Sequence, residues 1–282
     1  MKNILVPTDF SNTSLAAMEV AVSMAVATGA SITVLHVVEE VTPDSYSVAG
    51  QGHPEAIDEG RFNSLMIRKA HERLERLVKD PRFAAVEVNG ELKVGNPFHG
   101  IKTIIAEHAP DLVVMGTRGH TKMEEMIIGS NAEKVVRLMH CPVLTVHKKP
   151  AKTEFKKIVY ATSMSEEEVD FARVVKQLQA RYKAQVHLVR INTPGDFQRD
   201  RAVLGYMEQF AKKVGLTNFT RHVYNDLTVE EGIVYFADAI KADLICMATH
   251  GRTGFAHVMA GSIAEDVVNH ARRPVLTSLI GK

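Results

Sequence analysis

Short apolar runs alternate with amphipathic segments along this chain, and this alternation predicts strands separated by helices. In the first half, apolar runs bounded by proline, glycine or polar residues predict strands at residues 4–7, 32–38, 86–93, 112–115 and 142–146. Apolar residues at helical spacing predict helices after Ser11 or Thr13, over residues 65–78, after the Asn96-Pro97 start signal and over about 131–139. Gly29 is the expected end of the first helix.

The same order of elements occurs again in the second half, which indicates an internal duplication. Here the predicted strands are residues 158–160, 186–191, 219–224, 244–247 and 275–279. The predicted helices start at capping boxes over 165–168 and 228–231, or cover residues 200–214 and 263–270. Polar, proline-containing residues 148–155 predict a linker, so we expect one domain at 1–147 and another at 156–282.

Strands that alternate with helices predict an α/β fold, with a doubly wound parallel sheet in each half. In such open sheets, ligands bind beyond the carboxyl ends of the strands, where the strand order reverses. The Thr8-Asp9 loop and the loop after residues 112–115 both lie at that edge. They would face each other if the first and fourth strands were neighbours. Residues 40–58 have no periodicity and predict a long loop.

The composition narrows the functional class. The length of 282 residues fits two domains, and the net charge of +1 gives no bulk attraction to nucleic acid or to an acidic membrane. No apolar run reaches the ~20 residues of a membrane span, and the N-terminus enters a strand pattern without a signal-peptide layout. The 13 histidines and two cysteines show no metal-ligand spacing. We therefore expect a cytoplasmic protein with free thiols, no metal site, and no nucleic-acid or membrane partner.

A glycine-rich loop after the fourth predicted strand carries the candidate chemistry. Gly116-Thr117-Arg118-Gly119 is followed, after nine residues, by Gly129-Ser130 and a predicted helix. Glycines let backbone N–H groups approach an anion, and a helix N-terminus favours negative charge. A second copy, Ala248-Thr249-His250-Gly251 with Gly261-Ser262, occupies the same place in the other half. This pattern predicts phosphate binding.

The spacing G-x-x-G-x9-G-[ST] resembles the ATP-binding fingerprint of the universal stress protein family. Further similarity lies in Val6-Pro7-Thr8-Asp9, in Leu35-His36-Val37 and in Cys141-Pro142-Val143-Leu144. The resemblance covers nearly the whole chain as two tandem copies. It implies two five-stranded parallel sheets flanked by helices, in an adenine-nucleotide alpha-hydrolase-like fold. It also implies that the fifth strands of the two halves pair into an internal pseudo-dimer, while association of two chains and the identity of a protein partner stay open.

The resemblance implies ATP, ADP or AMP as ligand, alone or with Mg²⁺. Pro7, Thr8 and Asp9 would line the adenosine side, with Asp9 as acceptor, and Val37 would pack on the adenine. Residues of the loop would wrap the ribose and the first phosphates: Met115, Gly116, Arg118 and Gly119. The outer phosphates would lie at Gly129, Ser130 and Asn131.

The second half departs from this pattern, since Ser163 stands in place of Asp9, Ala248 in place of Gly116 and Arg190 in place of His36. A lost charge-assisted hydrogen bond costs roughly 1.5–3 kcal/mol, about a factor of ten to a hundred in affinity. We therefore expect the first half to bind ATP and the second half to bind it weakly or not at all. The residues of the weaker site would be Thr162, His250, Gly251, Gly261 and Ser262.

Other interpretations compete with a nucleotide-dependent stress sensor or regulator. Asp9 could serve only to begin a helix, and Met115 and Met247 could be ordinary core residues. The sequence has no nucleophile elbow and no G-x-x-x-x-G-K-[ST] loop, so any ATP hydrolysis should be slow. A weak ATPase or adenylyl-transfer enzyme is one alternative. A nucleotide-free interaction scaffold is another.

Overall fold

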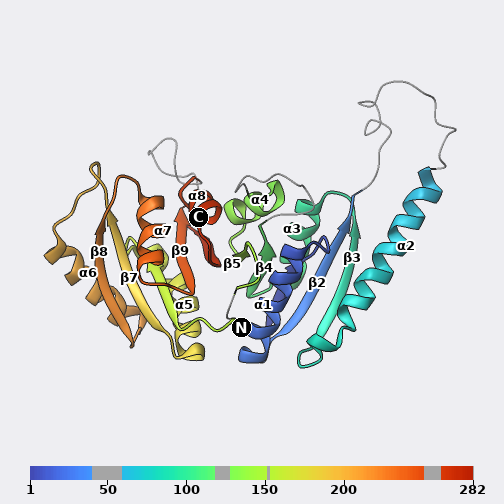
Figure 1. Ribbon diagram of the computed structural model, residues 1–282, viewed down its shortest axis with the longest axis horizontal. Coiled ribbons are helices and arrows are strands. Elements are labelled where there is room, and N and C mark those ends of the chain that lie inside the picture. The colour runs from blue at the N-terminus through green and yellow to red at the C-terminus, as the bar shows by residue number, and fades with distance from the viewer. Residues whose placement is uncertain (40–58, 118–127, 151–152, 251–261, 282) are drawn as a thin grey trace, which may run out of the picture.

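The computed structural model describes residues 1–39, 59–117, 128–150, 153–250 and 262–281 (Figure 1). The first half contains β1 (Asn3–Pro7), α1 (Asn12–Thr28), β2 (Ser31–Val38), α2 (Glu59–Val78), the 3₁₀ helix η2 (Pro81–Phe83), β3 (Val88–Val94), α3 (Pro97–His108), β4 (Leu112–Gly116), α4 (Ser130–Leu138) and β5 (Val143–Val146). The second half contains β6 (Lys157–Ala161), the 3₁₀ helix η3 (Glu166–Glu168), α5 (Val169–Tyr182), β7 (Gln185–Asn192), α6 (Asp200–Val214), β8 (Phe219–Asn225), α7 (Val229–Ala239), β9 (Leu244–His250), α8 (Ser262–His270) and β10 (Val275–Ile280).

All ten of these strands form one sheet, in the order β3-β2-β1-β4-β5-β10-β9-β6-β7-β8. Within each half the neighbouring strands are parallel, as the alternation of strands and helices predicts. The halves join where β5 and β10 run antiparallel, with Leu144 opposite Leu276. The expected pairing of the fifth strands is therefore confirmed. β1 also lies between β2 and β4, so the first and fourth strands are neighbours.

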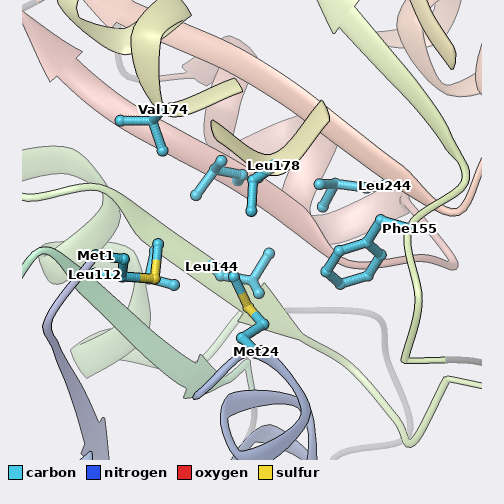
Figure 2. Close-up of a pocket in the computed structure, with 9 residues that line it drawn as sticks. Met1, Met24, Leu112, Leu144, Phe155, Val174, Leu178 and Leu244 are labelled. Atoms are coloured by element: carbon cyan, nitrogen blue, oxygen red, sulfur yellow. The ribbon is translucent and has the colours of Figure 1, made fainter. Parts of the chain in front are cut away.

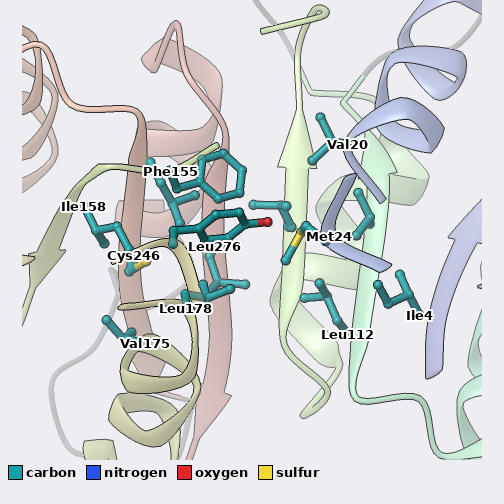
Figure 3. Close-up of a cluster of buried hydrophobic side chains, with 14 of the residues drawn as sticks. Ile4, Val20, Met24, Leu112, Phe155, Ile158, Val175, Leu178, Cys246 and Leu276 are labelled. Carbon is teal, nitrogen blue, oxygen red and sulfur yellow. The ribbon is translucent and has the colours of Figure 1, made fainter. Parts of the chain in front are cut away.

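Two apolar layers cover the sheet and continue across both halves. The first lies under α1, α2, α5 and α6, and the second under α3, α4, α7 and α8. Figure 3 shows the first layer at the junction, where Phe155 and Leu276 of the second half face Met24 of the first. Figure 2 shows a crevice between the halves lined by side chains such as Leu178 and Leu244, which leaves no volume for a water molecule. This crevice is a packed contact between the halves.

The predicted linker ends inside this packed contact. Phe155 has no exposed surface, and its ring meets that of Tyr182 edge to face at 5.3 Å between centroids. Burying an aromatic side chain stabilises a fold by about 1.5–3 kcal/mol. The connection therefore fixes the second half against the first near its end and does not act as a free tether.

Most predicted helix ends are confirmed. Ser11 caps α1 by accepting the N–H of Ser14, and Gly29 ends that helix at φ +73°, a conformation that glycine adopts without strain. Asn96 and Thr228 cap α3 and α7 in the same way. The capping box over 165–168 is wrong. The side chain of Ser165 caps nothing, residues 166–168 form a 3₁₀ turn, and the Glu168 carboxylate turns toward the end of β6. The predicted loop at 40–58 lies outside the described residues.

Candidate functional site

The candidate site lies at the carboxyl ends of β1 and β4. Because β1 has β2 on one side and β4 on the other, the strand order reverses there, which is the usual ligand position of an open α/β sheet. Thr8 and Asp9 leave the sheet at this edge, and Thr117 leaves it beside them after β4. The chain then returns at Ile128 to begin α4 at Ser130. Arg118 and Gly119 lie outside the described residues.

Asp9 is held at the edge by its own loop. Its Oδ1 accepts the N–H of Ser11 at 2.9 Å, and Phe10 between them has φ +61°, which tightens the turn. Ser11 then caps α1, so the loop and the helix start are one structural unit. As a residue, Asp9 is only partly buried. The helix-entry interpretation of Asp9 is thus partly true, and it is compatible with a ligand-binding role.

His36 on β2 supports the same loop from the neighbouring strand. Its Nδ1 lies 2.7 Å from the Thr8 carbonyl oxygen, so Nδ1 carries the proton and donates. The ring also packs on Phe10, at 4.5 Å between centroids. Burial lowers the pKa of His36, although the Thr8 carbonyl and Asp9 oppose that shift. The ring is thereby favoured in its neutral form, as a positioning group for the Thr8-Asp9 turn.

The side chains of three predicted ligand-contact residues make their contacts within the protein. The Thr8 hydroxyl accepts the N–H of Phe10 at 3.0 Å and lies 3.1 Å from the Ser14 hydroxyl, buried under α1. Met115 is buried in the second apolar layer. Val37 is packed so tightly against α3 that a Cβ at Gly100 would lie 2.7 Å from it. These side chains shape the edge, and Pro7 is only partly buried beside them.

Gly116 is needed by the packing of α1. A Cβ there would lie 2.9 Å from the Thr13 carbonyl carbon and 3.0 Å from the Ser14 nitrogen, both of them backbone atoms. From the sequence, we expect a glycine here so that a phosphate can approach. The structure instead shows that residue 116 needs to be a glycine because the backbone of α1 lies against it. Ala248 occupies this place in the second half. There the 3₁₀ turn η3, which follows β6, stands in the position of the start of α1.

Gly129 differs from Gly116 in its surroundings. Its φ of −66° and ψ of 146° suit any residue, and among the described residues an added Cβ would meet only the Thr117 carbonyl oxygen at 3.4 Å, an ordinary contact. It stands at the N-cap of α4 and provides no side-chain cap. The first-turn N–H groups at Ser130 and Asn131 therefore begin a helix whose N-cap residue has no side chain to accept from them.

The residues present at α4 fit an anionic group. A helix N-terminus offers N–H donors and a partial positive charge, and the glycine adds no side chain of its own in front of them. Glu133 in the first turn works against this, but Arg137 lies 3.4 Å from it as an ion-pair partner. Across the junction, burial and the carboxylates of Glu133 and Asp266 raise the pKa of Glu265 on α8. Negative side chains therefore gather along the sides of these two helices.

The equivalent edge of the second half is filled by a carboxylate. Glu168, only 2% exposed, lies where the first half has Ser14. Its Oε2 accepts the hydroxyls of Tyr160 at 3.0 Å and Thr162 at 2.5 Å. Its Oε1 accepts the N–H of Ser163 at 2.8 Å and the hydroxyl of the same residue at 2.5 Å. Burial and Glu168 raise the pKa of the Tyr160 phenol well above its ordinary value, which keeps that donor protonated.

The other predicted residues of the second half lie away from the Glu168 network or outside the described residues. Arg190, which stands in place of His36, is paired with Asp196 at 2.7 Å and does not support the turn after β6 in the way that His36 supports the turn after β1. His250 ends β9 and Ser262 begins α8, while Gly251 and Gly261 lie outside the described residues. The sequence pattern missed Glu168 because it fitted a capping box, and its wholly acidic run 166–168 gave no sign that one member is buried.

Two further findings concern the described ranges alone. In them, no group of three or more His, Cys, Asp or Glu side chains is arranged to hold a metal ion. None of their helices is both long and apolar enough to cross a membrane.

Comparison with known proteins gives a consistent result. The profile of the universal stress protein family matches residues 1–147 and again residues 154–278. The chain is 35% identical over 151 residues to universal stress protein MJ0531 of Methanocaldococcus jannaschii, which covers 54% of this chain and 84% of that protein. Universal stress protein YxiE of Bacillus subtilis is 32% identical over 145 residues, covering 51% of this chain and 97% of its own length.

A solved structure extends the likeness to both halves at once. A universal stress protein from Archaeoglobus fulgidus superposes with a TM-score of 0.76, covering 99% of this chain and 98% of its own, at 22% sequence identity. At that identity the superposition supports the fold and says nothing about a ligand. The tandem α/β arrangement is therefore shared with a solved universal stress protein.

Proposed function

The chain belongs to the universal stress protein family, and we propose that it is an adenine-nucleotide-binding protein whose first half takes ATP. The observation that carries this proposal is the N-terminus of α4, begun by a glycine N-cap, at the same sheet edge as the Asp9 carboxylate. The Asp9 carboxylate suits the hydroxyls or amine of an adenosine, and the N–H groups of α4 suit the phosphates.

Each group has a separate task in this proposal. Asp9, fixed by the N–H of Ser11, accepts hydrogen bonds from the nucleoside without first losing side-chain freedom. The N–H groups at Ser130 and Asn131 receive the outer phosphates, and Gly129 leaves them accessible. His36 and Ser14 act indirectly, by holding the Thr8-Asp9 turn in place.

We propose further that the second half binds the nucleotide weakly or not at all. In that half, the hydroxyl of Thr162 and both the N–H and the hydroxyl of Ser163 already donate to Glu168. A ligand there would also meet a buried carboxylate, and the Asp9 equivalent is absent. The buried Glu168 carboxylate and the absence of a carboxylate at position 163 both disfavour an anion there, separately from the Ala248 difference.

The broader role follows from family membership and belongs to the same proposal. We infer a nucleotide-dependent regulator in stress physiology, acting in the cytoplasm, with ADP or AMP as alternative ligands to ATP. Turnover should be slow, because the sequence has no nucleophile elbow and no G-x-x-x-x-G-K-[ST] loop. Phosphate release measured beside nucleotide retention separates a sensor from a slow ATPase.

The test is equilibrium dialysis of labelled ATP with full-length protein stripped of nucleotide. We expect about one tight site per chain. Asp9→Ala should weaken it roughly ten- to a hundredfold, because a charge-assisted hydrogen bond is lost. Ser163→Ala is the matched control in the other half and should leave tight binding unchanged. Two equal sites per chain would contradict the asymmetry, and no binding at millimolar ATP would contradict the proposed function itself.

A further inference from the structure

Both ends of the glycine loop in the first half are attached to one turn of a helix in the second half. The N–H of Ile128, just before Gly129, donates to the Asn269 Oδ1 of α8 at 2.7 Å. At the other end, the Thr117 hydroxyl lies 2.9 Å from Nδ1 of His147, and Nε2 of His147 is hydrogen-bonded to the Val268 carbonyl. Asn269 and Val268 are consecutive residues, in the last turn of α8.

The chemistry of these contacts fixes the direction of each hydrogen bond. Val268 is in the last turn of α8, where carbonyl groups lack a helical partner, so its carbonyl oxygen accepts a hydrogen bond from the Nε2–H of His147. Nδ1 of the neutral ring is then an acceptor, and the Thr117 hydroxyl donates to it. Thr117 has no exposed surface, so the hydrogen bond from its hydroxyl begins in a buried position, whereas His147 is partly buried.

The same arrangement brings the loop ends together. Thr117 accepts the N–H of Gly129 through its carbonyl at 2.7 Å and donates its own N–H to Val146 at 3.1 Å. The start of α4 is thus attached to Thr117, and Thr117 is attached through His147 to α8. Helices α4 and α8 pack against each other at the junction (Figure 1).

The duplication does not repeat this device. Alignment of Gly129-Ser130 with Gly261-Ser262 places Arg137 of α4 opposite Asn269. Alignment of the fifth strands places Leu279 opposite His147, and Thr249, opposite Thr117, donates instead to the Ser278 carbonyl at 3.4 Å. The histidine and the asparagine therefore both serve the first half, which is the half that keeps Asp9 and Gly116.

We propose that Asn269 and His147 are positioning residues for phosphate binding in the first half, so that the second half completes the site instead of providing another one. This inference rests on the proposed function, because it concerns the same α4 N-terminus. Because Ile128 is fixed by Asn269, the backbone that enters α4 has a fixed position, and so do the N–H groups of the first turn. Loss of the hold should therefore weaken contacts to the phosphates and leave contacts to the adenosine unchanged.

The experiment uses the full chain and compares two ligands. Calorimetry with ATP and with adenosine is performed on the unaltered protein, Asn269→Ala and His147→Leu, the second of which installs the residue found in the other half. Each variant should weaken ATP binding roughly three- to tenfold, the effect of one net hydrogen bond, with adenosine binding unchanged. Asn218→Ala is the matched control, since Asn218 donates to Ala184 within the second half, away from the junction.

Amide hydrogen exchange of the free protein gives a second readout that needs no nucleotide. The Ile128 amide should lose protection in Asn269→Ala and keep it in Asn269→Asp, which retains an oxygen acceptor. Unchanged ATP affinity in both variants, equal losses for ATP and adenosine, or an Ile128 amide indifferent to Asn269 would each overturn the inference. If the unaltered protein ignores both ligands while the Ile128 amide behaves as expected, the hydrogen bond stands, but the proposed function fails and the phosphate role of Asn269 and His147 fails with it.

Discussion

Replacing Glu168 with alanine should strongly destabilise the protein, because this carboxylate organises the end of β6. Four donors converge on it: the hydroxyls of Tyr160 and Thr162 and both the N–H and the hydroxyl of Ser163. Alanine removes the acceptor from all four. The Thr162 hydroxyl also accepts the N–H of Met164 at 2.8 Å, so the turn that leads into η3 loses part of its support as well.

The magnitude follows from the kind of group left behind. A buried donor without a partner costs about 1–3 kcal/mol, and a hydrogen bond to a charged group contributes about 1.5–3 kcal/mol. The three hydroxyls can rotate toward other acceptors, whereas the Ser163 N–H is fixed by the backbone. We therefore expect a loss of about 3–5 kcal/mol, a large part of the 5–15 kcal/mol that typically stabilises a domain.

The assay is urea unfolding of the full chain at neutral pH, followed by circular dichroism. The denaturation midpoint should fall, with an unchanged dependence on urea if the native state stays equally compact. Glu168→Gln should cost less than alanine. Its amide oxygen can face the fixed Ser163 N–H while its amide nitrogen donates to hydroxyls that rotate, so what it mainly loses is the charge.

Glu166 is the matched control in the same turn. Its side chain is 82% exposed and forms an ion pair with Lys213, and such exposed pairs contribute about 0–1 kcal/mol. Glu166→Ala should therefore change the free energy of unfolding by less than about 0.5 kcal/mol. If Glu168→Ala lies within about 1 kcal/mol of the unaltered protein, or matches Glu166→Ala, the network does not have the importance assigned to it here.

Two further predictions concern packing and pH. Gly116→Ala should lower the free energy of unfolding by about 1–3 kcal/mol, because its methyl group meets the backbone of α1. Gly205→Ala in α6 is the control; it has open space around it and should stabilise the protein by up to about 1 kcal/mol. Equal effects of the two substitutions would contradict the contact assigned to Gly116. Burial lowers the pKa of His187 and His222, so the unfolded chain binds more protons than the native one below about pH 6.5. Stability should be fully present above that pH and fall on acidification, and His187→Gln should flatten the fall measured by unfolding at several pH values; an unchanged slope would argue against it.

The contrast between the halves has a simple physical origin. A buried carboxylate must be hydrogen-bonded, and Glu168 obtains its partners from the groups that, in the first half, surround an open edge. Once those donors are used, the edge is more stable and less suited to an anion. The two halves thus differ at this edge through few substitutions, with Ser163 in place of Asp9 and Glu168 in place of Ser14.

Sequence alone determined the local structure and the duplication, because periodicity, caps and glycines act over a few neighbouring residues. It predicted α6 at its observed bounds, the caps at Ser11 and Asn96, and the place of Asp9 after a strand. It also indicated the sheet edge at which a ligand should lie. The pairing of the fifth strands came from the resemblance to a family, and the pairing of β5 with β10 agrees with it.

Tertiary structure decided where each polar side chain found its partner. Glu168 fitted a capping box in sequence, yet its carboxylate turned into a buried pocket of donors where hydrogen bonds to it are stronger. Asn269 and His147 carry no local signal, since their partners, Ile128 and the Val268 carbonyl, lie in the opposite half. Contacts between residues more than a hundred positions apart depend on how the two halves share one sheet, and no periodicity in the chain encodes that arrangement.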